Sequence, residues 1–97
     1  MRYAIVLAPE AAEDFRALKA NLRPTVRAAL ETHLRHNPRK QSKSRIKRLR
    51  GLSRPQYQIR VDEIRVFYDV TELNVQVLAI VVKAHAQEWL ERWGEKS

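Results

Sequence analysis

The sequence predicts an α+β fold for a single domain spanning residues 1–97. Two helical patterns follow a short N-terminal strand, an alternating apolar pattern runs from Gln56 to Val82, and a last helical pattern closes the chain. Because helices and strands are segregated along the chain, we expect the order β-α-α-β-β-β-α, with an antiparallel sheet, an N-terminal helical hairpin and a C-terminal helix. Ninety-seven residues, 44% of them apolar, can bury one modest core.

The N-terminal part of the chain contains the first strand and both early helices. Residues 3–8 are apolar and β-prone, which predicts a strand. Pro9 suits the first turn of a helix, and apolar residues at helical spacing extend that helix over about 9–20. A second helix is predicted from Pro24 to Asn37, where Pro38 ends it. Its apolar stripe has i, i+4, i+8 spacing and consists of Val26, Leu30 and Leu34.

The central and C-terminal parts predict a basic segment, three strands and a helix. Residues 38–54 form the basic segment, whose apolar anchors are Ile46, Leu49 and Leu52. The following three strands are joined by hairpins at Asp62–Glu63 and Leu73–Asn74. Strict alternation puts four residues of the third strand on one face, namely Val75, Val77, Ala79 and Val81. The last helix carries Ala86, Trp89, Leu90 and Trp93 at i, i+3, i+4 and i+7, and ends near Gly94.

The first hairpin brings two arginines together. If Asp62 and Glu63 are the turn residues, the apolar residues of both strands share one face, and Arg60 stands opposite Arg65 on the other. Like charges in that position are destabilising, and two guanidinium groups on a rigid surface suit a phosphate. The alternative is that the arginines splay apart or pair with nearby carboxylates.

Positive charge is concentrated in one region. Ten basic residues and no carboxylate lie between Thr32 and Val61, whereas the whole chain carries +8. Such a block predicts contact with the phosphates of a nucleic acid or a ribosome, although basic runs are also found as solvated surface. The expected contacts are Lys40, Lys43, Arg45, Lys47, Arg48, Arg50 and Arg54.

Several classes of function are not expected. The chain has no cysteine, which excludes disulfides and thiolate metal sites and makes a reducing cytoplasm the expected compartment. Three histidines without spaced carboxylates do not form a metal motif, and no glycine-rich phosphate loop is present. We therefore expect no metal and no small-molecule cofactor. No segment approaches the roughly 20 apolar residues of a membrane span, so no membrane association is expected.

Three runs, in order and spacing, resemble the RelE/ParE superfamily of bacterial toxins. They are K-R-L-R-G-L at 47–52, Y-Q-I-R at 57–60 and I-R-V-F-Y at 64–68. The flanking strand and helices are similar as well, so the resemblance covers nearly the whole chain. It implies a RelE-like fold and the toxin of a type II toxin–antitoxin system, with a cognate antitoxin as partner.

The resemblance also implies an activity. RelE-type members enter the ribosomal A site and cleave mRNA without a metal, so the ribosome and mRNA are expected partners. Arg65 matches the family's phosphate-gripping arginine, and Arg60 matches the basic residue of the preceding strand. Lys83 can add positive charge. His85 can move a proton, because histidine titrates near neutral pH and other branches use a histidine near the C-terminus.

The sequence departs from the RelE pattern at three places. Gln58 stands where a RelE-type enzyme can carry lysine, Ala84 where a further arginine is common, and Trp89 or Leu90 where many members have tyrosine. Two alternatives therefore remain open. One is the ParE-type branch, which blocks DNA gyrase without nuclease activity, and the other is a degenerate member that retains only antitoxin binding.

Overall fold

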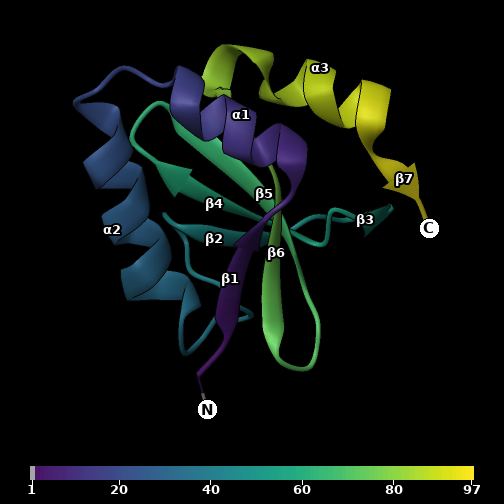
Figure 1. Ribbon diagram of the computed structural model, residues 1–97. Coiled ribbons are helices and arrows are strands. Elements are labelled where there is room, and N and C mark those ends of the chain that lie inside the picture. Colours follow the sequence, from purple (N-terminus) through teal and green to yellow (C-terminus); the bar gives the residue numbers. More distant parts are fainter. Residues whose placement is uncertain (1) are drawn as a thin grey trace.

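The structure is a computed structural model that describes residues 2–97, and it confirms the α+β fold (Figure 1). The helices are α1 (Pro9–Ala17), α2 (Leu22–Leu34) and α3 (Lys83–Trp93). The strands are β1 (Ala4–Leu7), β2 (Ile46–Arg48), β3 (Leu52–Arg54), β4 (Tyr57–Val61), β5 (Ile64–Val70), β6 (Asn74–Val82) and β7 (Glu95–Lys96). Within residues 2–97, no helix is long and apolar enough to cross a membrane.

A five-stranded sheet organises the molecule. Its order is β1-β6-β5-β4-β2, and β3 and β7 form a separate two-stranded ribbon. The predicted antiparallel pairing holds for β4, β5 and β6, and β2, which was not predicted, pairs antiparallel with β4. Strand β1 pairs with β6 in parallel, so the sheet is mixed. The chain passes through α1, α2 and four further strands before β6 pairs with β1, and a crossover of that length allows parallel pairing.

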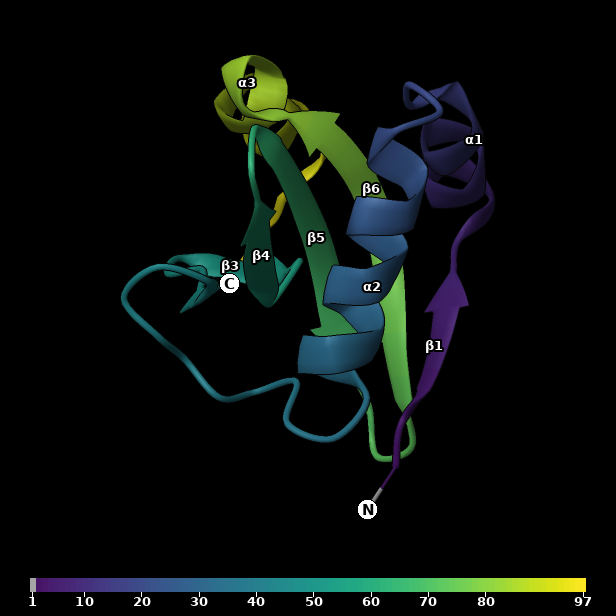
Figure 2. The same ribbon diagram turned by 90° about the vertical axis from the view of Figure 1, so that its left-hand side faces the viewer.

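Helices cover the sheet on both faces. Helices α1 and α2 lie on one side and α3 lies on the other (Figure 2). The larger core contains the predicted stripe of α2, since Val26, Leu30 and Leu34 are all buried. On the opposite face, Trp89 of α3 stacks on Phe67 of β5, with ring centroids 5.0 Å apart. The face under α3 carries the candidate site.

A bulge in β6 makes the predicted strict alternation of this strand wrong. Tyr68 is paired with Val77 but Phe67 with Ala79, which leaves Leu78 as an extra residue. The inward face of β6 therefore switches, so that Val77 faces α1 and α2 whereas Ala79 faces α3. The Ile80 amide donates to Oδ2 of Asp14 on α1, at 3.0 Å.

The basic segment is held against the domain instead of forming a free loop. Strand β2 pairs with β4, which places Ile46 opposite Ile59, and both side chains are buried. Leu49 is buried against the α3 face of the sheet. The Tyr68 hydroxyl donates to the carbonyl of Pro38 at 2.7 Å. These contacts fix the backbone on which most of the cations stand.

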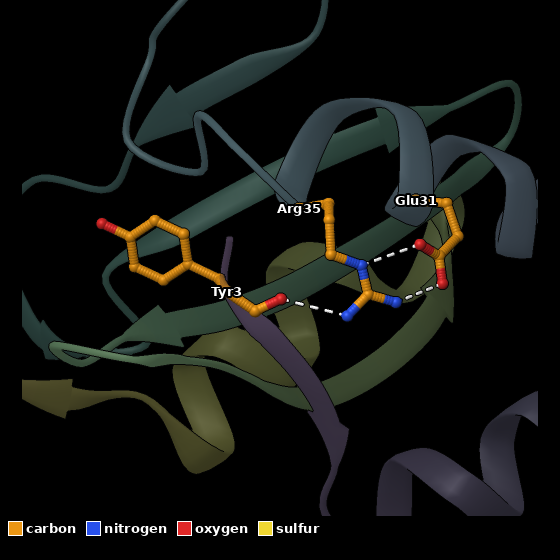
Figure 3. Close-up of polar contacts among 3 residues, drawn as sticks. All are labelled: Tyr3, Glu31 and Arg35. Atoms are coloured by element: carbon orange, nitrogen blue, oxygen red, sulfur yellow. Dashed lines mark hydrogen bonds and ion pairs between the residues drawn. The ribbon is translucent and has the colours of Figure 1, made fainter. Parts of the chain in front are cut away.

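Helix α2 is fastened to β1 through Arg35 (Figure 3). The guanidinium of Arg35 donates to both carboxylate oxygens of Glu31 and, at 3.0 Å, to the carbonyl of Tyr3. The Tyr3 amide in turn donates to the Arg35 carbonyl at 2.8 Å. Bonding to Glu31 raises the pKa of Arg35 and lowers that of the glutamate. Arg35 therefore has a structural role, although it lies in the basic stretch of the sequence.

A basic cavity as the candidate functional site

The predicted register of the first hairpin is confirmed. Val61 pairs with Ile64, Arg60 with Arg65 and Ile59 with Val66. The apolar partners face the larger core, so the two arginines lie on the face that also carries α3. The Arg60 amide donates to the carbonyl of Arg45 at 2.9 Å, which places the residue before β2 beside this pair.

Arg65 is fixed by the hairpin turn. Its side chain is largely buried, with 5% of the residue exposed. One guanidinium nitrogen, Nη1, donates to the carbonyls of Asp62 at 2.8 Å and Ile64 at 3.0 Å. Arg60, by contrast, is exposed. Neither arginine forms an ion pair with any carboxylate of residues 2–97, so no carboxylate of the described chain neutralises either positive charge directly.

The same turn holds the beginning of α3. The Lys83 amide donates to the carbonyl of Glu63 at 2.7 Å. Lys83 is the first residue of α3, and the positive end of the helix dipole lies there. The hairpin turn thus positions Arg65 through a side-chain contact and Lys83 through its backbone.

These residues line one open cavity of about 360 Å³. Its floor is the exposed face of β4 and β5, one wall is β2 with the segment before it, and the other wall is the first turn of α3. The lining residues are Ser42, Lys43, Arg45, Lys47, Gln58, Arg60, Arg65, Lys83, Ala86 and Gln87. Six are cations and none is a carboxylate, so the cavity attracts a polyanion. We call it the basic cavity.

The structure brings together most, but not all, of the predicted site residues. Arg60, Arg65 and Lys83 line the basic cavity, as do three of the predicted RNA contacts, namely Lys43, Arg45 and Lys47. His85 does not line it. Lys83, Ala86 and Gln87 share one face of α3 at i, i+3 and i+4, whereas His85, at i+2, is exposed elsewhere on the helix.

The other predicted RNA contacts lie around or away from the cavity. Lys40 lines a neighbouring depression together with Arg45, and Arg50 lines a depression that also includes Lys47. Arg48 lies over the ring of Tyr57, 5.2 Å from its centroid. Arg54 forms an ion pair with Asp69, at 3.4 Å between Nε and Oδ2. The last two arginines therefore have partners within the protein.

Two lining glutamines were not predicted as site residues. Gln58 was named only because it stands where a RelE-type enzyme can carry lysine, and Gln87 was not named. The spacing of Gln87 four residues after Lys83 is a signal that sequence reasoning can use, because it places both on one helical face. Gln58 follows from strand alternation, since it lies two residues before Arg60.

Negative charge gathers on another part of the surface. A groove of about 710 Å³ between α1 and the end of α3 is lined by the acidic residues Glu10, Glu13, Asp14 and Glu95. Only one cation, Arg54, lines it. Within the described chain, 2–97, no three His, Asp or Glu side chains gather as metal ligands do. Charge is thus segregated, and an anionic ligand is directed to the basic cavity.

Comparisons with known proteins agree with this fold. The family of ParE toxins of the parDE type II toxin–antitoxin system matches residues 5–89. A double mutant of Escherichia coli RelE in the free state has a TM-score of 0.74 and 24% identity, covering 94% of this chain and 93% of that one. No curated protein sequence matches.

Two further solved structures share the fold. The RelE–RelB complex from Pyrococcus horikoshii OT3 gives a TM-score of 0.69 at 17% identity, covering 86% of this chain and 97% of that one. The YoeB dimer from Staphylococcus aureus gives a TM-score of 0.61 at 19% sequence identity, covering 81% of this chain and 94% of that one. Since the family match extends over most of the residues that build the sheet and the cavity, the chain belongs to the ParE toxin family of the RelE/ParE superfamily and is a toxin of a type II toxin–antitoxin system.

Proposed function

We propose that this toxin is a metal-independent endoribonuclease that cleaves mRNA on the ribosome in the cytoplasm and so inhibits translation. The observation that carries the proposal is the juxtaposition of Arg60 and Arg65 in a cavity with six cations and no carboxylate. A cavity of this charge suits the phosphodiester of RNA. The RelE-like fold is compatible with the same activity.

The proposed reaction is an attack of the ribose 2′-hydroxyl on the adjacent phosphate. The 2′-oxygen forms a bond to phosphorus and loses its proton, while the bond to the 5′-oxygen breaks and that oxygen gains a proton. Negative charge grows on the non-bridging oxygens during this step. Arg60 and Arg65 are placed to bind these oxygens, and Lys83 adds positive charge at the wall. Lys43, Lys47 and Lys83, which line the cavity, are the candidate groups for proton transfer.

The surrounding cations are assigned to docking on ribosomal RNA. Lys40, Lys43, Arg45, Lys47 and Arg50 are exposed and lie in or beside the basic cavity. Contacts to phosphate position a protein without reading sequence, so these residues are expected to set affinity. The cognate antitoxin is expected to inhibit by presenting carboxylates to this surface, because neutralising it relieves the self-repulsion of the toxin.

Two observations favour a second function, the inhibition of DNA gyrase. The matching family is that of ParE toxins, and Gln58 replaces a lysine that a RelE-type enzyme can use. A neutral amide is a poor general base, whereas a toxin that only binds its target needs no proton transfer. In this alternative the basic cavity binds gyrase without chemistry.

Parallel assays of the purified toxin separate the two functions. Ribosomes programmed with a defined mRNA are incubated with the toxin, and cleavage is read by primer extension. Gyrase supercoiling is measured with the same preparation. We expect cleavage that is lost in Arg60→Ala and Arg65→Ala but kept in Arg92→Ala, a control on the far end of α3. Inhibited supercoiling with intact mRNA favours the ParE-type function, and inactivity in both assays favours a member that only binds antitoxin.

A further inference from the structure

We propose that Gln58 and Gln87 form a subsite in the basic cavity that binds a nucleobase and prefers adenine. The proposal rests on the proposed function in one respect, that the ligand of the cavity is RNA. It concerns the two neutral amides among the lining residues, one on β4 and one on α3.

Gln58 lies in the floor of the cavity. On the sheet it is paired with Lys47 of β2 and with Phe67 of β5. It is half-buried and points to the same face as Arg60, two residues further along β4. Two residues of a strand span about 7 Å, so the two side chains leave the strand at a spacing that one nucleotide can bridge.

Gln87 lies in the wall formed by α3. It is one helical turn after Lys83 and on the same face of the helix, so it borders the cavity farther from the hairpin turn than Lys83 does. Its side chain is exposed. The two amides therefore approach the cavity from different elements, one from the floor and one from the wall, and both lie beyond the cations that face the phosphate.

Both amides are available to a ligand. Throughout residues 2–97, no side-chain hydrogen bond involves Gln58 or Gln87. Two other glutamines are engaged, since Gln41 accepts from the Arg48 amide and Gln56 accepts from the Val70 amide. A carboxamide carries two donor hydrogens and an acceptor oxygen, so the cavity holds four N–H donors and two acceptors that the fold does not use.

The chemistry of these groups favours a base edge over a phosphate. A neutral amide competes poorly for a phosphate when six cations line the same cavity. An amide presents a donor and an acceptor side by side, and the bidentate pairing that glutamine forms in base readout is with the N6 amino group and N7 of adenine. Single-stranded RNA displays its bases in this way when they are unstacked and splayed out.

The test is equilibrium binding of short RNAs to the full-length toxin. Fluorescently labelled hexauridylate is compared with hexamers that carry one central adenine, cytosine or guanine. We expect the wild-type toxin to bind the adenine hexamer at least about fivefold more tightly than hexauridylate. In Gln58→Ala/Gln87→Ala this ratio should fall to about one, with hexauridylate affinity changed less than about twofold. Gln76→Ala, on β6 outside the cavity, is the matched control and should keep the ratio.

The remaining outcomes separate this proposal from the nuclease proposal. Wild-type binding without base preference, a preference that persists in the double variant, or an equal loss for all hexamers overturns the subsite. A failure of every hexamer to bind at low salt overturns the subsite, whereas the nuclease proposal is decided by the cleavage assay on programmed ribosomes. An adenine preference that depends on the glutamines, in a toxin that cleaves no mRNA, supports the subsite and removes the nuclease. Melting temperatures of the variants confirm that each is folded.

Discussion

At the residue scale, Arg65 is held in place before any ligand arrives. Its Nη1 donates to the carbonyls of Asp62 and Ile64, and 5% of the residue is exposed. A charged group that is already oriented loses little freedom on binding, which strengthens its effect on a developing negative charge. Arg60 is exposed and has no such restraint. Arg65 is therefore the residue on which the site depends most.

His85 is the predicted catalytic residue that lies outside the basic cavity. It is exposed on α3, away from the face that carries Lys83 and Gln87. A general base must reach the proton it removes, within about 3 Å or through one water. We therefore expect His85→Gln to change the rate of mRNA cleavage by less than about threefold. A loss of about 100-fold, with an unchanged melting temperature, would return His85 to the catalytic set.

Asp69 lies buried at the foot of the sheet and affects stability. Its Oδ1 accepts the Gln56 amide at 2.8 Å, and Arg54 approaches Oδ2. Burial raises the pKa of Asp69 above its ordinary value of 3.8, and these partners only reduce that effect. The folded state therefore binds the proton more tightly than the unfolded state, so stability falls as the pH rises through the pKa of the folded state.

The raised pKa of Asp69 predicts how the substitution Asp69→Asn changes stability. Asparagine keeps an oxygen to accept the Gln56 amide but cannot ionise. We expect the variant to gain free energy of unfolding relative to the wild type at pH 7, and the gain to shrink as the pH falls from 7 through the raised pKa of folded Asp69 toward about 3.8. Urea unfolding of both proteins at pH 7 and near pH 3.8 measures the difference in free energy of unfolding. A difference that is the same at both would show that ionisation of Asp69 is not its cause.

At the scale of elements, the hairpin turn between β4 and β5 organises the cavity. Its Asp62 and Glu63 carbonyls hold Arg65 and the start of α3, respectively. Asp62 has φ of 52°, in the left-handed region, which aspartate and glycine tolerate and β-branched residues do not. The backbone conformation of this turn therefore determines where Arg65 and Lys83 lie.

Substitutions in the turn test its role. Asp62→Val should lower the free energy of unfolding by roughly 1–3 kcal/mol, because valine is strained at this φ. It should also reduce cleavage per folded molecule, since the carbonyl that holds Arg65 shifts. Asp62→Gly and Glu63→Val are the controls and should retain activity. If Asp62→Val were folded and fully active, the turn would not position Arg65.

Physical reasons explain which elements could be predicted from the sequence and which could not. The α2 stripe and the β4–β5 register were predictable, because burial of one face fixes the period. Strands β2 and β3 have three residues each and β7 has two, too short for a periodic pattern. The β6 bulge was missed because one extra residue reverses the alternation without a local signal. Arg60 and Arg65 followed from the register, and Gln58 follows from the alternation of the same strand, whereas Gln87 joins the site because α3 lies beside the sheet.

At the scale of the whole molecule, the cations are gathered on a surface that the fold keeps open. Lys43 and Lys47 line the cavity and are exposed. For each phosphate contact, the logarithm of the affinity for single-stranded nucleic acid falls by about 0.7 when the salt concentration rises tenfold. Replacing both lysines with glutamine should therefore reduce the salt slope of RNA or ribosome binding by about 1.4. Arg16→Gln/Lys19→Gln, at and just after the end of α1, is the charge-matched control, and an equal effect there would show a general charge effect.

Mapping of mRNA 5′ ends after induced expression in bacteria tests the central claim, that the cavity around Arg65 acts on ribosome-bound RNA. Wild-type toxin should produce cuts phased with the reading frame. Arg65→Ala, at equal abundance, should produce on the order of 100- to 1,000-fold fewer, because a charge contact to the transition state is lost. Intact mRNA with DNA-damage signalling in cells that express the wild type, or undiminished phased cuts with Arg65→Ala, would contradict the account.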